Sequence, residues 1–387
     1  MLKLNRLLYS TVSDDSFLDE ILPTDKQRAV LEGAKNIIRD HLKLEIRKAT
    51  VSYLGLEKAI TPRFRKQGSW RYGTCVQPAW APPQQLDLDF GVYLPISAWE
   101  DHGPPHKIAP LYFKLVEGLL KGLCAQHGWS LRENGNCIRV EVASWGHIDI
   151  PLYAVPEKEF EQIMERALAA NLLRKSANDS VARMDAAAEL EEQEWDDFDA
   201  IVLATRLGEW KKSDSEKVSK WFLDRVKEHN EQLQRVCMYL KAWRDFQWKG
   251  GGGPTSVSIT VAVAQSFECY AGRDDLALEH AARHIDVALR GEIREEGIDD
   301  DKEDFNRLPE EKRLEASGKA QALVDALRQA RALRAGNENS ATEIMIKELG
   351  TRLPDKPHLV DVDNGDSVRS TPARTVPPPV VRSTKAG

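Results

Sequence analysis

The sequence predicts an α+β fold, in which a domain built around a mixed sheet precedes a helical domain and a flexible tail. Apolar and polar residues alternate at residues 86–90 and again within 137–153, and a period of two is typical of strands. From about residue 157 the apolar spacing becomes helical. We therefore expect three parts, at residues 1–160, 161–352 and 353–387.

Two helices are predicted to flank the strands of the first part. Thr24 and Gln27 form a capping-box pattern ahead of an amphipathic stretch that runs to about residue 50. A second helix is predicted between the Pro104-Pro105 break and Gly128, because apolar residues recur at helical spacing between them. Both helices have an apolar face that can cover a sheet.

The remainder of the chain is predicted to be helical up to its tail. Amphipathic stretches lie at residues 159–173, 215–246 and 318–333, and the glycine run at 250–253 interrupts them. The last part is rich in Pro, Ser, Thr and charged residues, a composition typical of disorder.

The bulk composition excludes several classes of protein. The chain has 387 residues, of which 42% are hydrophobic and 30% charged, so it can bury the cores of two or three domains. No apolar run approaches the roughly 18 residues that a membrane span requires. The net charge of −7 argues against a protein whose main task is to hold a long nucleic acid, because that task needs a basic surface. We therefore expect no membrane partner and no stable nucleic-acid partner.

The N-terminus and the cysteines favour a cytoplasmic location. The N-terminal residues have too few apolar positions, and become acidic too early, for a secretory signal. The five cysteines are far apart and form no CxxC pair, which is typical of free thiols in a reducing compartment.

Three aspartates are the strongest candidates for a catalytic site. Asp87 and Asp89 lie two residues apart in a predicted strand and therefore project from the same face, as do His147 and Asp149 in a later strand. If the strands are neighbours, three carboxylates converge, and the pKa of one of them rises unless a cation lies between them. Two Mg²⁺ ions about 4 Å apart, or Mn²⁺ in their place, would make this a site for phosphoryl transfer. The simpler alternative is that Asp87 and Asp89 lie on the wet face of an edge strand.

The pair Gly68-Ser69 precedes these aspartates and is typical of a phosphate-binding loop. A glycine lets the backbone approach a phosphate closely, and the amides together with the Ser69 hydroxyl can donate to phosphate oxygens. The alternative is an ordinary turn.

These motifs resemble the polymerase-β-like nucleotidyltransferase superfamily. QGSWRYGT, LDLDFGVYLP, HIDIPLYAVP and LKAWRDFQWKGGGGPTS resemble, more closely, the bacterial cGAS/DncV-like nucleotidyltransferases, which make cyclic dinucleotide or trinucleotide signals in anti-phage (CBASS) defence. The similarity covers roughly residues 20–350. Residues 70–86 separate Ser69 from Asp87, a longer spacing than the superfamily's but similar to that of the bacterial cyclases. The resemblance implies a polymerase-β-like core with a mixed sheet plus a C-terminal helical domain, in two lobes with a central active-site cleft.

The resemblance also implies roles for individual residues. Asp87, Asp89 and Asp149 would bind the two metal ions, and Gln67 and Ser69 would hold the donor triphosphate.

Further residues would surround the nucleotides. Tyr72 would lie near a nucleotide, and Lys241 and Ser256 would bind the triphosphate. The alternative for Lys241 is an i, i+4 pair with Asp245, in the weaker orientation of such pairs. The alternative for the glycine run before Ser256 is a turn between helices.

The acceptor nucleotide would meet three more residues. Arg139 would lie beside its base or phosphate, and Ser213 and Asp214 would contact its base. Alternatively, Arg139 faces solvent from a strand, and Ser213 forms a capping box with Glu216.

The function that we expect from these motifs is a cyclic oligonucleotide synthase that makes a cGAMP-like product from ATP and GTP for a downstream effector. The alternatives are a non-cyclising nucleotidyltransferase that modifies an RNA, a protein or a small molecule, and a catalytically inert nucleotide-binding scaffold. The resemblance further suggests that an enzyme similar to ubiquitin-activating and ubiquitin-conjugating proteins joins Gly387 to a partner; an idle tail is the alternative.

Overall fold

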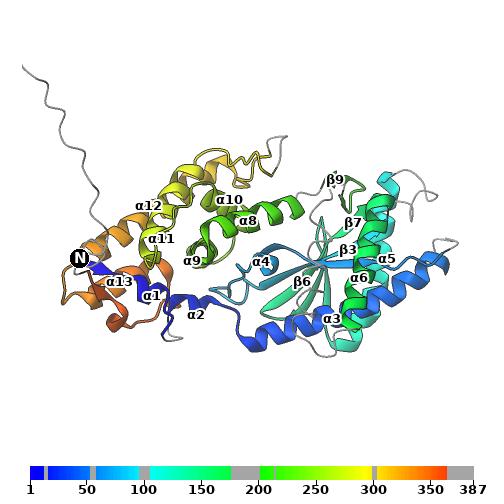
Figure 1. The fold of residues 1–387 in the computed structure, drawn as a ribbon, viewed down its shortest axis with the longest axis horizontal. Coiled ribbons are helices and arrows are strands. Elements are labelled where there is room, and N and C mark those ends of the chain that lie inside the picture. Colours follow the sequence, from blue (N-terminus) through cyan, green and yellow to red (C-terminus); the bar gives the residue numbers. More distant parts are fainter. Residues whose placement is uncertain are drawn as a thin grey trace, which may run out of the picture.

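The computed structural model describes residues 1–12, 16–52, 58–95, 105–175, 201–212, 215–298 and 303–363. They form two lobes, one with a sheet and one that is almost entirely helical (Figure 1). Within this described part, none of the helices has the length and apolar character needed to cross a membrane.

The sheet lobe contains the first strands and helices that the sequence predicts. Its elements are α3 (Asp25–Ser52), β2 (Arg63–Lys66), α4 (Gly68–Arg71), β3 (Leu86–Pro95), α5 (Pro105–His127), β4 (Ser130–Glu133), β5 (Ile138–Ala143), β6 (Gly146–Ile150), β7 (Leu152–Val155), α6 (Glu157–Lys175), β8 (Val202–Ala204) and β9 (Trp210–Lys212). The strand order is β4-β5-β6-β3-β7-β8-β9, and β2 also pairs with β3. Because β3 is parallel to β6 and β7 and antiparallel to β2, the predicted mixed sheet is confirmed.

Burial explains why β3 exposes its aspartates on one face only. Leu86, Leu88 and Phe90 are buried in a cluster that also contains the apolar faces of α3 and α5. Residues at alternate positions point to the opposite face of a strand, so these three side chains turn the intervening Asp87 and Asp89 away from the core. The apolar pattern of the strand thus orients both carboxylates.

The long helix α3 begins as its sequence predicts. The backbone amide of Thr24 donates to Gln27 Oε1 at 2.8 Å, and the Gln27 amide donates to Thr24 Oγ1 at 3.2 Å. This reciprocal pair is a capping box and satisfies two of the amides that a helix start leaves without partners.

The helical lobe is formed by both ends of the described chain. Its elements are β1 (Leu2–Lys3), α1 (Asn5–Leu8), α2 (Phe17–Ile21), α8 (Ser215–His229), α9 (Glu231–Gln247), α10 (Ser256–Gln265), α11 (Asp274–Ala288), α12 (Glu310–Ala332), α13 (Glu338–Leu349), η2 (Pro357–Leu359) and β10 (Asp361–Val362). The stretch 215–246 forms two helices because Asn230, with φ at +63°, separates them and accepts the Gln232 amide as the cap of α9.

Four segments lie elsewhere than our predicted boundaries place them. The part of α6 beyond residue 160 belongs to the sheet lobe, since Ile163 is buried with Tyr93 of β3 and Tyr153 of β7. Residues 1–12 and 16–22 belong to the helical lobe, since Leu4 and Phe17 are buried there and the Leu4 amide donates to Asp275 at 3.1 Å. Residues 202–212 extend the sheet through β8 and β9. The expected tail begins with a packed segment, because Leu353 and Leu359 are buried and β10 pairs with β1.

Candidate active site

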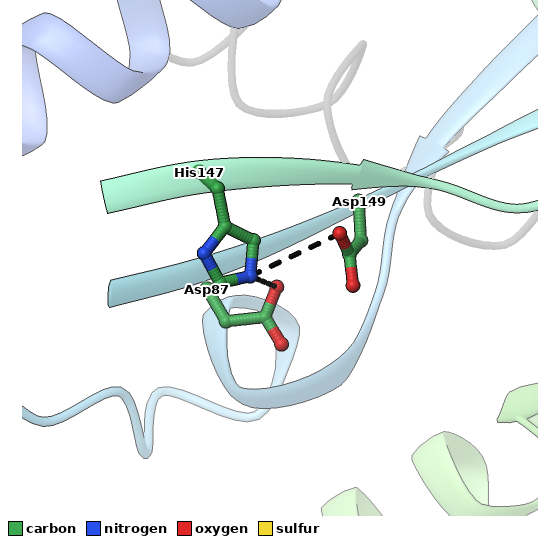
Figure 2. A group of neighbouring side chains, drawn as sticks. All are labelled: Asp87, His147 and Asp149. Carbon is green, nitrogen blue, oxygen red and sulfur yellow. Dashed lines mark ion pairs between the residues drawn. The ribbon is translucent and has the colours of Figure 1, made fainter. Parts of the chain in front are cut away.

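Two neighbouring parallel strands bring the predicted carboxylates together. In the pairing of β3 with β6, Asp87 lies opposite His147 and Asp89 lies opposite Asp149. One ligand atom from each of Asp87, His147 and Asp149 lies within 4.8 Å of the others, and Figure 2 shows the three side chains turned toward one another. The prediction that Asp149 joins the pair on β3 is therefore confirmed, and the alternative of a wet edge strand is wrong because β3 has strands on both sides.

The three carboxylates destabilise one another's ionised forms. The pKa of Asp89 is well above its ordinary value, first because its surroundings remove water from it and then because the charges of Asp87 and Asp149 lie close. Arg139 offsets part of this repulsion. Its Nε and Nη2 donate to the two oxygens of Asp149, each at 2.7 Å, and this pairing raises the pKa of Arg139. Arg139 therefore faces the acidic site, not bulk solvent as in our alternative, and its contact with an acceptor nucleotide stays a prediction.

The donor set fits divalent cations. Asp87 Oδ1 is shielded from solvent and makes no hydrogen bond to the described residues. Carboxylate oxygens of this kind are the ligands that Mg²⁺ prefers. A cation between the three aspartates would lower the pKa of Asp89 and offset the repulsion between the carboxylates.

The predicted Gly-Ser loop is the start of the short helix α4, and Gly68 allows this segment to approach Asp89. Its φ is +59°, in the left-handed region, and a Cβ at this position would lie 2.2 Å from Asp89 Oδ2. No side chain larger than hydrogen therefore fits here without moving the carboxylate.

We expect Gly68→Ala to lower activity about 100-fold and to lower the free energy of unfolding by about 1–2 kcal/mol, since it combines a left-handed backbone with displacement of Asp89. Gly128→Ala is the matched control, because Gly128 has φ at +68° but open space around its Cβ position. The control should lose similar stability and keep its activity, as checked by denaturant unfolding and turnover. Equal activity losses in both variants would contradict the close-approach argument.

A cavity of about 420 Å³ opens beside the carboxylates, between the two lobes. Of the residues predicted to bind nucleotide or metal, those that line it are Gly68, Ser69, Tyr72, Asp87, Asp89, Lys241 and Ser256. The first five come from the sheet lobe and its loop, whereas Lys241 and Ser256 come from α9 and the start of α10. This is the expected position of a cleft closed by the helical domain.

Gln67 has a different position from its neighbours in the loop. It is buried and does not line the cavity; its Nε2 donates to Tyr93 Oη at 2.7 Å, and its Oε1 accepts from Tyr153 Oη at 3.0 Å. Direct contact with a triphosphate stays a prediction, but these bonds fix the start of the Gly-Ser loop against β3 and β7.

Lys241 is the buried cation of the cavity. Its side chain is 2% exposed, and Nζ donates to Thr74 Oγ1 at 2.7 Å and to Thr74 O at 3.3 Å. Burial, followed by the nearby charge of Arg244, lowers its pKa to about 8. Asp245, which we considered as its partner, instead forms an ion pair with Arg244 at 2.7 Å.

Other residues of the site carry no signal in the sequence that identifies them. Thr74 holds Lys241 from 167 positions away, and Gln84 joins the lobes by donating to Asp245 O at 2.8 Å and Trp248 O at 3.1 Å. The predicted contacts of Ser213, Asp214 and Gly387 lie outside the described residues.

Comparison with known proteins identifies the same two lobes. The family model "Cyclic GMP-AMP synthase DncV-like, nucleotidyltransferase domain" matches residues 62–153, and the model "Cyclic GMP-AMP synthase, C-terminal domain" matches residues 230–361. The chain is 35% identical over 223 residues to a cyclic GMP-AMP synthase of Vibrio cholerae serotype O1, a match that covers 55% of this chain and 49% of the relative. An Escherichia coli cyclic GMP-AMP synthase is 36% identical over 211 residues, covering 53% and 47%. The matches thus span about half the length of these curated relatives.

Solved structures share the fold along nearly the whole chain. Vibrio cholerae DncV cyclic AMP-GMP synthase, in complex with the linear intermediate 5′ pppA(3′,5′)pG, aligns with a TM-score of 0.71 at 23% identity, over 93% of this chain and 98% of that one. Escherichia coli DncV in its 3′-deoxy GTP bound form gives a TM-score of 0.69 at 22% identity, over 93% and 99%. These likenesses confirm the predicted fold class. Because two models of one family match the lobes in chain order over more than half of the chain, the chain belongs to the DncV-like cGAS nucleotidyltransferase family.

Proposed function

We propose that this chain is a cyclic dinucleotide synthase that joins ATP and GTP into a cGAMP-like ring and releases pyrophosphate at each bond. The observation that carries the proposal is the register of β3 and β6, which gathers three carboxylates beside a cavity that the Gly-Ser loop and Lys241 also line. Phosphoryl transfer needs carboxylates that bind cations and, facing them, groups that donate hydrogen bonds to the phosphates, because this chemistry depends on positioning and charge neutralisation.

The chain's own residues position the donor nucleotide. Ser69 and the amides of its loop donate to phosphate oxygens, and Lys241, held by Thr74, adds a positive charge on the opposite wall. Two Mg²⁺ ions at Asp87, Asp89 and Asp149 would neutralise the triphosphate and lower the pKa of the attacking 3′-hydroxyl. Arg139 keeps both oxygens of Asp149 in a fixed plane.

The choice of ATP and GTP rests on the relatives. The matched Vibrio cholerae and Escherichia coli proteins are cyclic GMP-AMP synthases, and structures of the Vibrio cholerae enzyme contain ATP with GTP or the linear intermediate 5′ pppA(3′,5′)pG. A single side chain that forms hydrogen bonds to a base can change which base is bound. The combination of adenine and guanine in the product is therefore the most specific claim of the proposal.

We further propose a role in anti-phage (CBASS) defence, with cytoplasmic synthesis and an effector that reads the product. Conjugation of Gly387 by an enzyme similar to ubiquitin-activating and ubiquitin-conjugating proteins belongs to the same proposal. Co-expression with such a partner, followed by mass spectrometry, should detect an isopeptide at Gly387. An unmodified tail beside an active partner would refute it.

Incubation of the purified chain with the four nucleoside triphosphates and Mg²⁺ or Mn²⁺ tests the reaction. We expect a nuclease-sensitive product with the mass of a cyclic GMP-AMP dinucleotide, and pyrophosphate in equal amount to the phosphodiester bonds. The Asp87→Asn, Asp89→Asn double variant is the control and should form none. A linear or protein-linked product would favour a non-cyclising transferase, and a double variant with full biological activity would favour an inert scaffold.

A further inference from the structure

His147 lies among the catalytic carboxylates with an unused ring nitrogen. It is 5% exposed, and its Nε2 lies 3.1 Å from Asp87 Oδ1 and 3.8 Å from Asp149 Oδ1 (Figure 2). Both Nε2 and Asp87 Oδ1 are shielded from solvent, and neither makes a hydrogen bond to any described residue. An unsatisfied buried polar atom costs about 1–3 kcal/mol, so two that face each other indicate a missing group between them.

Gln85 places a proton on Nδ1 of His147. The Gln85 amide Nε2 donates to Ser144 O at 3.2 Å, so its Oε1 is the atom 2.9 Å from His147 Nδ1. An amide oxygen only accepts, and Nδ1 therefore donates to it. In the neutral ring, this leaves the lone pair of Nε2 pointing at the two carboxylates. Histidines that bind metals through one nitrogen usually donate from the other to such an oxygen.

The distances suit adjacent ligands of one ion. A Mg²⁺-sized ion with bonds of 2.0–2.1 Å and octahedral angles separates neighbouring ligand atoms by about 3 Å. The contact of 3.1 Å between His147 Nε2 and Asp87 Oδ1 meets this condition, and the ligand atom of Asp149 lies within 4.8 Å of both.

We propose that His147 Nε2 is a ligand of the divalent ion that Asp87 and Asp149 share, with Gln85 as the residue that positions the ring. This inference deepens the proposed function, since it concerns the metal site of that reaction. An imidazole ligand favours transition-metal ions relative to Mg²⁺, whereas oxygen ligands alone do not. The site is accordingly one that binds Mn²⁺ more tightly than a site of three carboxylates would.

Pulsed electron paramagnetic resonance of Mn²⁺ bound to the full chain tests the ligand directly. We expect a nitrogen coupling from a coordinated imidazole, which changes when the histidines carry ¹⁵N and disappears in His147→Gln. The same variant should lose at least about 10-fold in Mn²⁺ affinity and less than about 3-fold in Mg²⁺ affinity. Gln85→Leu should keep the nitrogen coupling and lose Mn²⁺ affinity to a smaller degree.

His41→Gln is the matched control, because His41 is a half-buried histidine of the same lobe whose Nε2 lies 2.9 Å from Leu119 O, away from the site. It should leave the coupling and both affinities unchanged. A wild-type spectrum without nitrogen coupling, or coupling that persists in His147→Gln, overturns the proposal.

Product formation on the same samples separates this proposal from the proposed function. A wild-type chain that makes product without nitrogen coupling overturns the ligand and leaves the reaction standing. Nitrogen coupling in a chain that makes no phosphodiester supports the ligand and removes the reaction.

Discussion

Asp89→Asn is expected to abolish at least about 99.9% of the activity and, in the absence of metal, to make the protein more stable. Loss of one carboxylate removes a ligand of the cations that neutralise the triphosphate. We expect this loss to lower the activity about 10³-fold or more. The pKa of Asp89 is raised by burial and by its two acidic neighbours, so ionisation of Asp89 opposes folding. A neutral amide of the same size relieves this repulsion, and we expect the free energy of unfolding to rise by about 1–2 kcal/mol.

The pH dependence has a definite sign. Because the pKa of Asp89 is higher in the folded chain than in the unfolded chain, the folded state binds more protons between the two values. Stability of the metal-free protein should therefore fall as pH rises from the ordinary aspartate pKa through the raised one, and this fall should be smaller in Asp89→Asn. Thermal unfolding against pH, with and without Mg²⁺, measures both effects.

Asp224→Asn is the control for this prediction. Asp224 forms an exposed ion pair with Lys227 on α8, far along the chain from the site, and such pairs contribute little. The control should keep activity and stability. An Asp89→Asn variant that is less stable than wild type without metal would show that Asp89 is held by favourable contacts, and that the repulsion argument is wrong.

The fold could be predicted wherever a segment carries its own pattern. The alternation of Leu86, Leu88 and Phe90 with the two aspartates gave β3, and the capping box at Thr24 gave the start of α3. β8 and β9 have three residues each, too few for a period of two to be visible. The docking of residues 1–12 and 16–22 on the helical lobe depends on partners such as Asp275, which lies more than 270 positions from Leu4, and no local pattern records that contact.

The site could be predicted in its acidic half and only partly in its other half. Strand periodicity places Asp87 with Asp89 and His147 with Asp149, and the parallel pairing of the two strands brings the two pairs side by side. The family resemblance placed Lys241 and Ser256 at the cavity. Tertiary partners decide the remaining roles: Thr74 orients Lys241, Tyr93 and Tyr153 enclose Gln67, and Asp149 takes Arg139. The unused nitrogen of His147 appears only when the bonds of Gln85 are known.

Lys241→Met is expected to lower the affinity for a nonhydrolysable nucleoside triphosphate about 10- to 100-fold, since a charge-assisted hydrogen bond contributes about 1.5–3 kcal/mol. The pKa of Lys241 is lowered to about 8, chiefly by burial. Wild-type affinity should therefore be highest below pH 8 and fall above it, as the free protein loses the proton that a phosphate needs. Calorimetric titrations between pH 6.5 and 9.5 should show this fall in the wild type and a flat profile in Lys241→Met.

The same lowered pKa has the opposite consequence for folding. The effect of the lysine on stability can therefore be measured separately from its effect on triphosphate affinity. Lys241 titrates near pH 8 in the folded chain and near its ordinary 10.5 in the unfolded chain, so the unfolded chain binds more protons between these values. Stability of the nucleotide-free protein should rise with pH across that window, and Lys241→Met should be more stable than wild type below it. Lys227→Met, at an exposed position of α8, is the control and should change neither affinity nor stability. If triphosphate affinity stayed constant through pH 8 in the wild type, the buried lysine would serve only to hold Thr74 and the loop around it, because a phosphate that needs its charge must respond when the charge is lost.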